Sequence, residues 1–183
     1  GFWRAMTWLI RPLTAADVLP YKSLRDEALE CAPESFSSDH AASVNRPASA
    51  YAPRFGAPAS GHFFLGAFAP DGPLLGCIGC ERELLPQQRH SARLVSMMVA
   101  PAAQRRGIGQ QLLAACIDQA TQVVGLEQLT LSVTASNHHV VRLYERAGFR
   151  AWGLLPRAIV VRGAGYDQLH MVRLLPSSVL TLP

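Results

Sequence analysis

The chain has 183 residues and a mass of 19.8 kDa, the size of one domain. Apolar residues make up 49% and charged residues 16%, as in globular proteins, and no apolar run approaches the roughly 18–20 residues that cross a bilayer. The net charge is +4, but the arginines are scattered, whereas nucleic-acid binders typically carry a basic stripe or tail. We therefore expect one domain over residues 1–183 that binds neither membranes nor nucleic acids.

The first residues and the four cysteines bear on the cellular compartment. The apolar opening is interrupted by arginines and lacks a cleavage site of small residues, so we expect no secretory signal, with Met6 as the native start and residues 1–5 as a remnant of cloning. Four cysteines are too few for a secreted disulfide scaffold. Cys77 and Cys80 fall on opposite faces of a predicted strand, which disfavours a metal or redox pair. We expect buried thiols in a reducing cytoplasm.

The first third of the chain is predicted to form a strand, a helix and a long irregular segment. Trp8–Pro12 has the pattern of a short strand, and Asp17–Glu30 has apolar residues near helical spacing. Residues 31–61 are rich in alanine, serine and proline. We expect a short helix over Ser38–Asn45 within a loop-rich region that folds over a site as a flexible wall.

The rest of the chain alternates predicted strands and helices. Two apolar runs that flank the turn at residues 70–73 predict a β-hairpin. The further predicted strands are Arg93–Val99, Gln128–Thr134, Arg150–Leu155, Ala158–Val161 and Gln168–Leu175, and the further helices are Ile108–Val124 and Asn137–Ala147. This order predicts a single mixed α/β sheet of six to seven strands with helices on both faces.

The connection between the strand Arg93–Val99 and the next helix carries the most specific signal. Two glycines one residue apart, Gly107 and Gly109, open an amphipathic helix. The first amides of a helix have no internal partner and lie at the positive end of its dipole, so they attract phosphate oxygens, and Arg105 and Arg106 add charge. The alternative is that the glycines only permit a tight connection. Neither a nucleotide P-loop pattern nor G-x-G-x-x-G is present.

The segment Gln104-Arg105-Arg106-Gly107-Ile108-Gly109 resembles the Q/R-x-x-G-x-G/A signature of the GCN5-related N-acetyltransferases (GNAT), which bind acetyl-coenzyme A (acetyl-CoA). A second match follows at Asn137, at Tyr144 seven residues later, and at Gly148-Phe149. The two motifs span about residues 93–149. The resemblance implies a GNAT-like, mostly antiparallel sheet, and transfer of an acetyl group from acetyl-CoA to a primary amine by direct attack, without a metal.

The resemblance also implies which residues hold the cofactor. Backbone amides of the signature would bind the pyrophosphate, and the main chain of the splayed strand before it would pair with the pantetheine arm. Asn137 would contribute a side-chain hydrogen bond, although capping its helix is an equally simple role. The implied cofactor-binding residues are Met97, Met98, Val99, Arg105, Arg106, Gly107, Ile108, Gly109, Gln110 and Asn137.

The resemblance makes Tyr144 the general acid that protonates the departing thiolate, since a phenol with a pKa of about 10 stays protonated at neutral pH. Its alternative role is that of a core tyrosine on the apolar face of its helix. Acidic residues are missing from Arg93–Val99, and the family's other site for a base is here Ser132. The remaining candidates for the base are Glu81, Glu83, Asp167 and His170, and Glu81 is our first choice.

The missing base supports an alternative function, a noncatalytic acyl-CoA-binding sensor with the same fold. The acceptor would be a small-molecule or peptide amine enclosed by residues 31–61, the hairpin at residues 61–85 and residues 156–167. Because residues 31–61 hold only two acidic side chains, a strongly cationic acceptor is not favoured. The apolar segment Val172–Leu182 suggests a homodimer.

Overall fold

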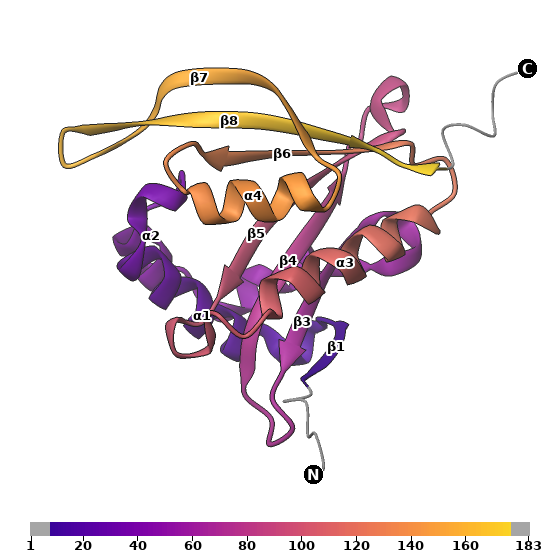
Figure 1. Ribbon diagram of the computed structural model, residues 1–183. Helices are drawn as coiled ribbons and strands as arrows, with labels where there is room; N and C mark the ends of the chain where they lie inside the picture. Colours follow the sequence, from indigo (N-terminus) through magenta and orange to yellow (C-terminus); the bar gives the residue numbers. More distant parts are fainter. Residues whose placement is uncertain (1–7, 177–183) are drawn as a thin grey trace, which may run out of the picture.

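The computed structural model describes residues 8–176, which form one open, twisted sheet between two layers of helices (Figure 1). Neighbouring strands follow the order β1-β3-β4-β5-β6-β8-β7, and the two-residue β2 pairs with β3. The strands are β1 Leu9–Pro12, β2 Gly56–Ala57, β3 His62–Phe68, β4 Leu74–Arg82, β5 Ser91–Val99, β6 Gln128–Thr134, β7 Arg150–Val161 and β8 Ala164–Leu174. All pairs are antiparallel except β5 with β6. The expected mixed, mostly antiparallel sheet is confirmed.

Four α-helices cover the sheet, two on each face (Figure 1). Helices α1 (Val18–Cys31) and α2 (His40–Asn45) lie on one face, and α3 (Ile108–Thr121) and α4 (His138–Arg146) on the other. A hydrophobic cluster fills each layer, because the strand side chains alternate between the two faces. None of the helices within residues 8–176 is long and apolar enough to span a membrane.

The strands β5 and β6 pair for only three residues and then separate. Residues 91–93 lie opposite residues 128–130 in parallel register, and no further pair joins the two strands. On its other edge, β5 bulges against β4 between Val95 and Met98, where Ser96 has a φ of +54°. A bulge bends its strand and leaves main-chain groups unpaired. The separation that the family resemblance implied is therefore present, and it opens the sheet at its centre.

Three details differ from the sequence-based expectations. The predicted strands Arg150–Leu155 and Ala158–Val161 are one strand, β7, because a bulge against β8 absorbs Pro156 and Arg157. Helix α3 ends at Thr121, three residues early, and the chain then turns at Gly125, whose φ is +80°.

The third difference concerns burial, both in residues 31–61, which the sequence predicts to be rich in loops, and at the cysteines, which it predicts to be buried. Residues 31–61 contain α2 as predicted, but Tyr51 and Phe55 of the same segment are buried against Tyr21 of α1, so the segment is anchored in the core. Cys77 and Cys80 are buried on opposite faces, as predicted, whereas Cys31 at the end of α1 is exposed. The expectations for residues 1–6 and for 177–182 lie outside the described residues.

Candidate active site

The turn before α3 presents a row of unpaired amides. Arg105 and Gly107 both adopt left-handed backbone conformations, with φ of +66° and +84°. The first amide of α3 with a partner is that of Gln111, which donates to the Gly107 carbonyl at 3.1 Å, so the N–H groups of residues 105–110 have no protein acceptor among the described residues. A Cβ at Gly107 would meet nothing within 4 Å. The turn is thus open, and suited to an anion.

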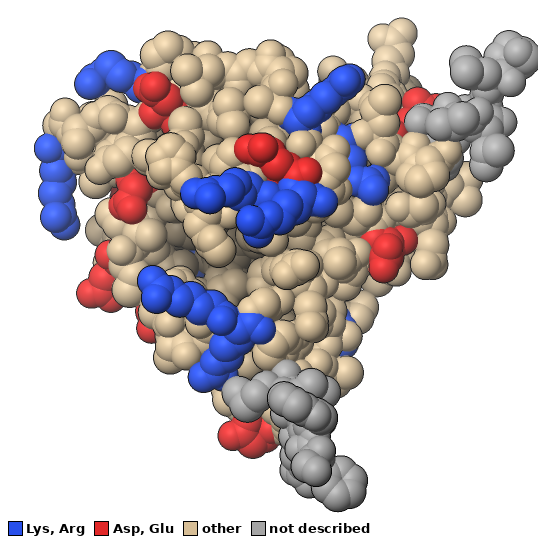
Figure 2. Space-filling model, viewed as in Figure 1, with Lys and Arg blue, Asp and Glu red and all other residues tan. Residues whose placement is uncertain are grey.

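Two polar side chains of this turn, Gln104 and Arg106, bond to main-chain carbonyls that precede it. Gln104 donates to the Val99 carbonyl at 3.3 Å, and Arg106 donates to the Ala102 carbonyl at 3.3 Å, so both fold back along the loop. Figure 2 shows a hollow in this face of the molecule, with basic side chains over the loop that leads into α3 and further charged side chains over α4.

Gly109, the second glycine of the turn, lies between β5 and α4. A Cβ built on Gly109 would lie 3.7 to 3.8 Å from Leu143 of α4 and from Met97 and Val99 of β5. A larger side chain at Gly109 would therefore enter the space between these elements. Along the same stretch, the edge of β5 that faces β6 carries no ladder hydrogen bonds beyond Arg93. Its main chain can pair with an extended ligand.

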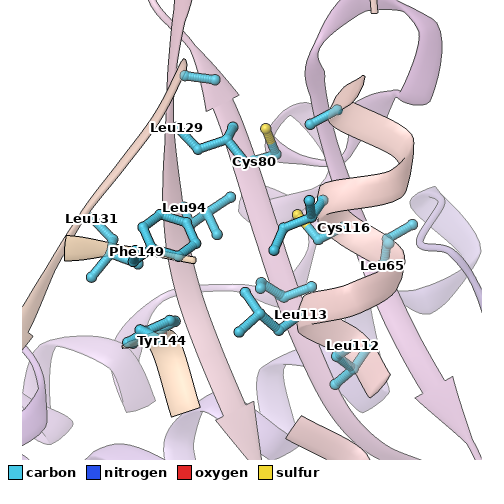
Figure 3. Packing of buried hydrophobic residues seen from close by; sticks show 14 of the residues in the cluster. Leu65, Cys80, Leu94, Leu112, Leu113, Cys116, Leu129, Leu131, Tyr144 and Phe149 are labelled. Carbon is cyan, nitrogen blue, oxygen red and sulfur yellow. The ribbon is translucent and has the colours of Figure 1, made fainter. Parts of the chain in front are cut away.

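Tyr144 of α4 faces β5 in the same layer. Its phenol donates to the Met97 sulfur at 3.7 Å, and its ring packs edge-on against Phe149 at 5.8 Å (Figure 3). The side chain is 7% exposed, and burial raises its pKa above the ordinary value, so the phenol is protonated at any physiological pH. Tyr144 is therefore a core residue whose hydroxyl points toward the Met97 side chain of β5, and its role as the general acid stays a prediction.

Asn137 precedes α4 and makes no capping hydrogen bond with its side chain. Its backbone N–H donates to the Thr134 carbonyl at 3.0 Å, and its own carbonyl accepts from Val141. The helix therefore begins without the side-chain cap that was the simpler interpretation of this residue. The amide side chain is half-buried and remains available to a ligand.

A pocket of about 540 Å³ opens on the opposite face of the sheet, under α1 and the segment after it. Its lining residues come from α1, residues 35–38, η3, β4, β5, β6, β7 and β8, where η3 is the 3₁₀ helix Ala48–Arg54. They include Ser96 at the β5 bulge and residues 130–132 of β6, so the pocket reaches the point where β5 and β6 separate. Of the three predicted walls, residues 31–61 and the hairpin contribute. Residues 156–167 do not, because that end of the β7–β8 hairpin extends past the pocket.

The pocket receives two of the four candidate bases. Glu81 is 22% exposed, and its carboxylate accepts from Arg54 and from Arg93, each at 3.4 Å. His170 lies 2.8 Å from the Ser132 hydroxyl through Nδ1 and packs on Trp152. Both residues line the pocket.

The other two candidates lie outside the pocket. Glu83 contacts Arg93 at 3.2 Å, and Asp167 accepts from the backbone of Arg157 at 2.9 Å. Sequence reasoning missed Arg25 and Arg54, which also line the pocket. The only available signal for Arg25 was its place four residues after Tyr21, on the buried face of α1.

The sheet is thus opened at its centre, with a turn of unpaired amides on one face and a pocket on the other. Residues 21–149 match the model of the acetyltransferase (GNAT) family. The chain belongs to this family.

Known proteins agree with this assignment. A mycothiol acetyltransferase from Salinispora tropica is 35% identical over 89 residues, which are 49% of this chain but only 29% of that protein. The GCN5-related N-acetyltransferase from Kribbella flavida superposes with a TM-score of 0.79 at 25% identity, covering 92% of this chain and 98% of its own. A phosphinothricin acetyltransferase from Sinorhizobium meliloti, solved with acetyl-CoA, superposes with a TM-score of 0.80 at 20% identity. The match covers 97% of this chain and 94% of that one.

Proposed function

We propose that this protein transfers an acetyl group from acetyl-CoA to a primary amine by direct attack. The observation that carries the proposal is the row of unpaired amides at residues 105–110, which lies beside the part of β5 that has separated from β6. The acceptor would enter from the other face, through the pocket that reaches Ser96. The two substrates would then meet where β5 leaves β6.

Acetyl-CoA would supply an activated acetyl thioester. The amides of residues 105–110 fit its pyrophosphate, because unpaired N–H groups at a helix start bind phosphate oxygens. The free edge of Met97, Met98 and Val99 fits the amide groups of the pantetheine arm. The Asn137 side chain, which caps nothing, would add a hydrogen bond.

The proposed reaction needs two proton transfers, one on each face of the sheet. Glu81 would accept the proton that the amine loses, directly or through water, as the new C–N bond forms. Tyr144 would donate its phenolic proton to the sulfur as the C–S bond breaks, and solvent would return that proton to the tyrosine. A main-chain N–H of β5 at the bulge would stabilise negative charge on the carbonyl oxygen.

Calorimetry with acetyl-CoA tests the proposal. The wild type should bind at micromolar to millimolar concentrations, and Gly109→Trp should abolish binding because the indole would fill the space beside the unpaired amides, against Met97 and Leu143. Ala114→Trp, on the exposed side of the same helix, is the matched control and should bind normally. A wild type that binds no acetyl-CoA would refute the proposal.

A noncatalytic acyl-CoA sensor is the second candidate. It is favoured by Ser132, which stands where relatives often carry an acidic residue, and by the arginines that already engage Glu81. Release of free coenzyme A thiol with any member of an amine panel would rule the sensor out. Binding without release, across small amines and peptides, would favour it.

We also propose a cytoplasmic homodimer. All four cysteines are free thiols, which suits a reducing compartment. The edge strand β7 exposes Trp152, Leu154, Leu155 and Val160, an apolar surface that a second copy would cover. Light scattering should give twice the chain mass, and Leu154→Glu should give the monomer. Of the segment Val172–Leu182, which the sequence suggests as the interface, only residues 172–176 belong to the part of the chain that the structure describes.

A further inference from the structure

Arg25 of α1 stands out as a buried cation without a partner. It is 7% exposed, and its Nε is the one buried side-chain polar atom without a hydrogen bond in the described residues 8–176. No ion pair to Arg25 is formed within that part of the chain, and its nearest compensation is the ring of Tyr51, 5.8 Å away. A buried guanidinium of this kind is costly unless an anion pairs with it.

The groups beneath Arg25 cannot supply that anion. Burial raises the pKa of the Cys77 thiol to about 12, and burial also raises the pKa of the Tyr21 phenol. Both groups are therefore neutral at physiological pH, although each lies close enough to interact with Arg25 and Arg54. The missing charge has to come from the open side, where Arg25 lines the pocket.

The pocket itself is short of negative charge. Three arginines line it, Arg25, Arg54 and Arg93, together with a single carboxylate, Glu81. Glu81 is already shared between Arg54 and Arg93, and Arg54 also donates to Tyr21 and Ser96, each at 3.4 Å. Of the three arginines, only Arg25 has no hydrogen-bond acceptor or ion-pair partner within residues 8–176, and its Nε is buried.

We propose that Arg25 binds a carboxylate of the acceptor, so that the substrate is a primary amine that also carries a carboxylate, an amino acid or a related small molecule. A guanidinium is suited to this group because its forked N–H donors match the two carboxylate oxygens. A pocket of about 540 Å³ lies in the range of small-molecule sites. The inference rests on the proposed acetyl transfer and specifies its acceptor.

The geometry orients such a substrate. Arg25 holds the carboxylate under α1, while Ser96 and Glu81 mark the end of the pocket near the separated strands, where the amine must react. Residues 35–38 and the stacked pair Trp152 and His170 border the remaining space and would contact the substrate side chain. An uncharged amine of equal size would leave Arg25 unpaired.

The test compares amines that differ only in the carboxylate. The standard L-amino acids and their carboxamides are supplied with acetyl-CoA, and thiol release is measured for wild type, Arg25→Met and Arg25→Lys. For the amino acids, Arg25→Met should lower kcat/KM by about 10- to 100-fold, the value of a charged hydrogen bond, and Arg25→Lys by less. For carboxamides, the same variants should change it by less than about threefold. Arg89→Met, on the exposed turn after β4, is the control for loss of an arginine.

In the kinetic test, two results would overturn the inference. The first is an equal kcat/KM of the wild type for amino acids and their carboxamides, and the second is an equal loss of kcat/KM for both classes in Arg25→Met. The melting temperature of Arg25→Met should stay level or rise, since an unpaired buried charge is removed, and a large fall would contradict the absence of a partner.

Binding without acetyl-CoA separates this inference from the proposed function. Saturation-transfer NMR with the same amino acids and with propionate should show contacts to wild type that Arg25→Met loses. If no amino acid is acetylated, binding of propionate that depends on Arg25 still supports the anion site. If propionate binding does not depend on Arg25, the inference is overturned. Failure of acetyl-CoA to bind would refute the acetyl transfer. The NMR comparison of wild type and Arg25→Met would still show whether Arg25 binds a carboxylate.

Discussion

Removal of one oxygen atom, in Tyr144→Phe, isolates the proposed acid. Among the described residues the phenol has one hydrogen-bond partner, the Met97 sulfur at 3.7 Å, and a thioether is a weak acceptor, so the ring packing against Phe149 should be kept. We expect the free energy of unfolding to change by less than about 1 kcal/mol. Proton transfer by a placed side chain contributes about 10²- to 10⁴-fold, so kcat should fall at least about 100-fold, or about 2.7 kcal/mol in activation free energy.

The assay is thiol release at saturating acetyl-CoA, with the affinity for acetyl-CoA measured separately by calorimetry. That affinity should stay within about threefold of wild type, because the proton moves only in the chemical step. Tyr166→Phe on β8 is the matched control and should leave both quantities unchanged. A kcat for Tyr144→Phe close to that of wild type would show that Tyr144 is only a core residue.

The pH dependence gives an independent check on Tyr144. Burial raises its pKa, so the folded protein holds this proton more tightly than the unfolded chain does. Its contribution to stability is complete below about pH 10 and is lost as pH rises through the higher folded value. Ionisation of the acid should therefore produce no fall in kcat up to about pH 10, and an alkaline limb below pH 9 that Tyr144→Phe abolishes would contradict the burial argument.

The other predictions concern the base and the N-terminal ion pair. Glu81→Gln should lower kcat/KM by about 100-fold at neutral pH while acetyl-CoA still binds, and an active Glu81→Gln with an inactive His170→Asn would transfer the role to His170. Asp17 accepts two bonds from Arg11, each at 2.9 Å, and one from the Thr14 amide, and chiefly the Arg11 bond lowers its pKa. Its stabilisation is present above about pH 4 and lost as pH falls through the lowered value, so Asp17→Asn should cost about 1–3 kcal/mol in urea unfolding at pH 7, with the difference shrinking toward pH 2. An equal cost at both pH values would show that packing, and not the charge, is responsible.

Patterns within the sequence determined the elements and the cofactor-side motif. The strand at 128–134 is found where its alternation predicts it, and the helix from Ile108 begins at the expected glycine turn. These features are readable because side-chain periodicity and the conformational freedom of Gly107 act over a few residues. The spacing between Asn137 and Tyr144 is local in the same way, because Asn137 directly precedes α4 and Tyr144 lies within it.

Only the tertiary structure decided what the acceptor pocket contains. Arg25, Arg54 and Glu81 are separated by 29 and 27 residues along the chain, and they line one pocket because α1 and η3 pack on the face of the sheet from which Glu81 of β4 projects. No local pattern marks such a set, because each residue by itself looks like an ordinary charged side chain. The importance of Arg25 follows from its burial. The same guanidinium in water would need no partner, whereas on the buried face of α1 it requires one.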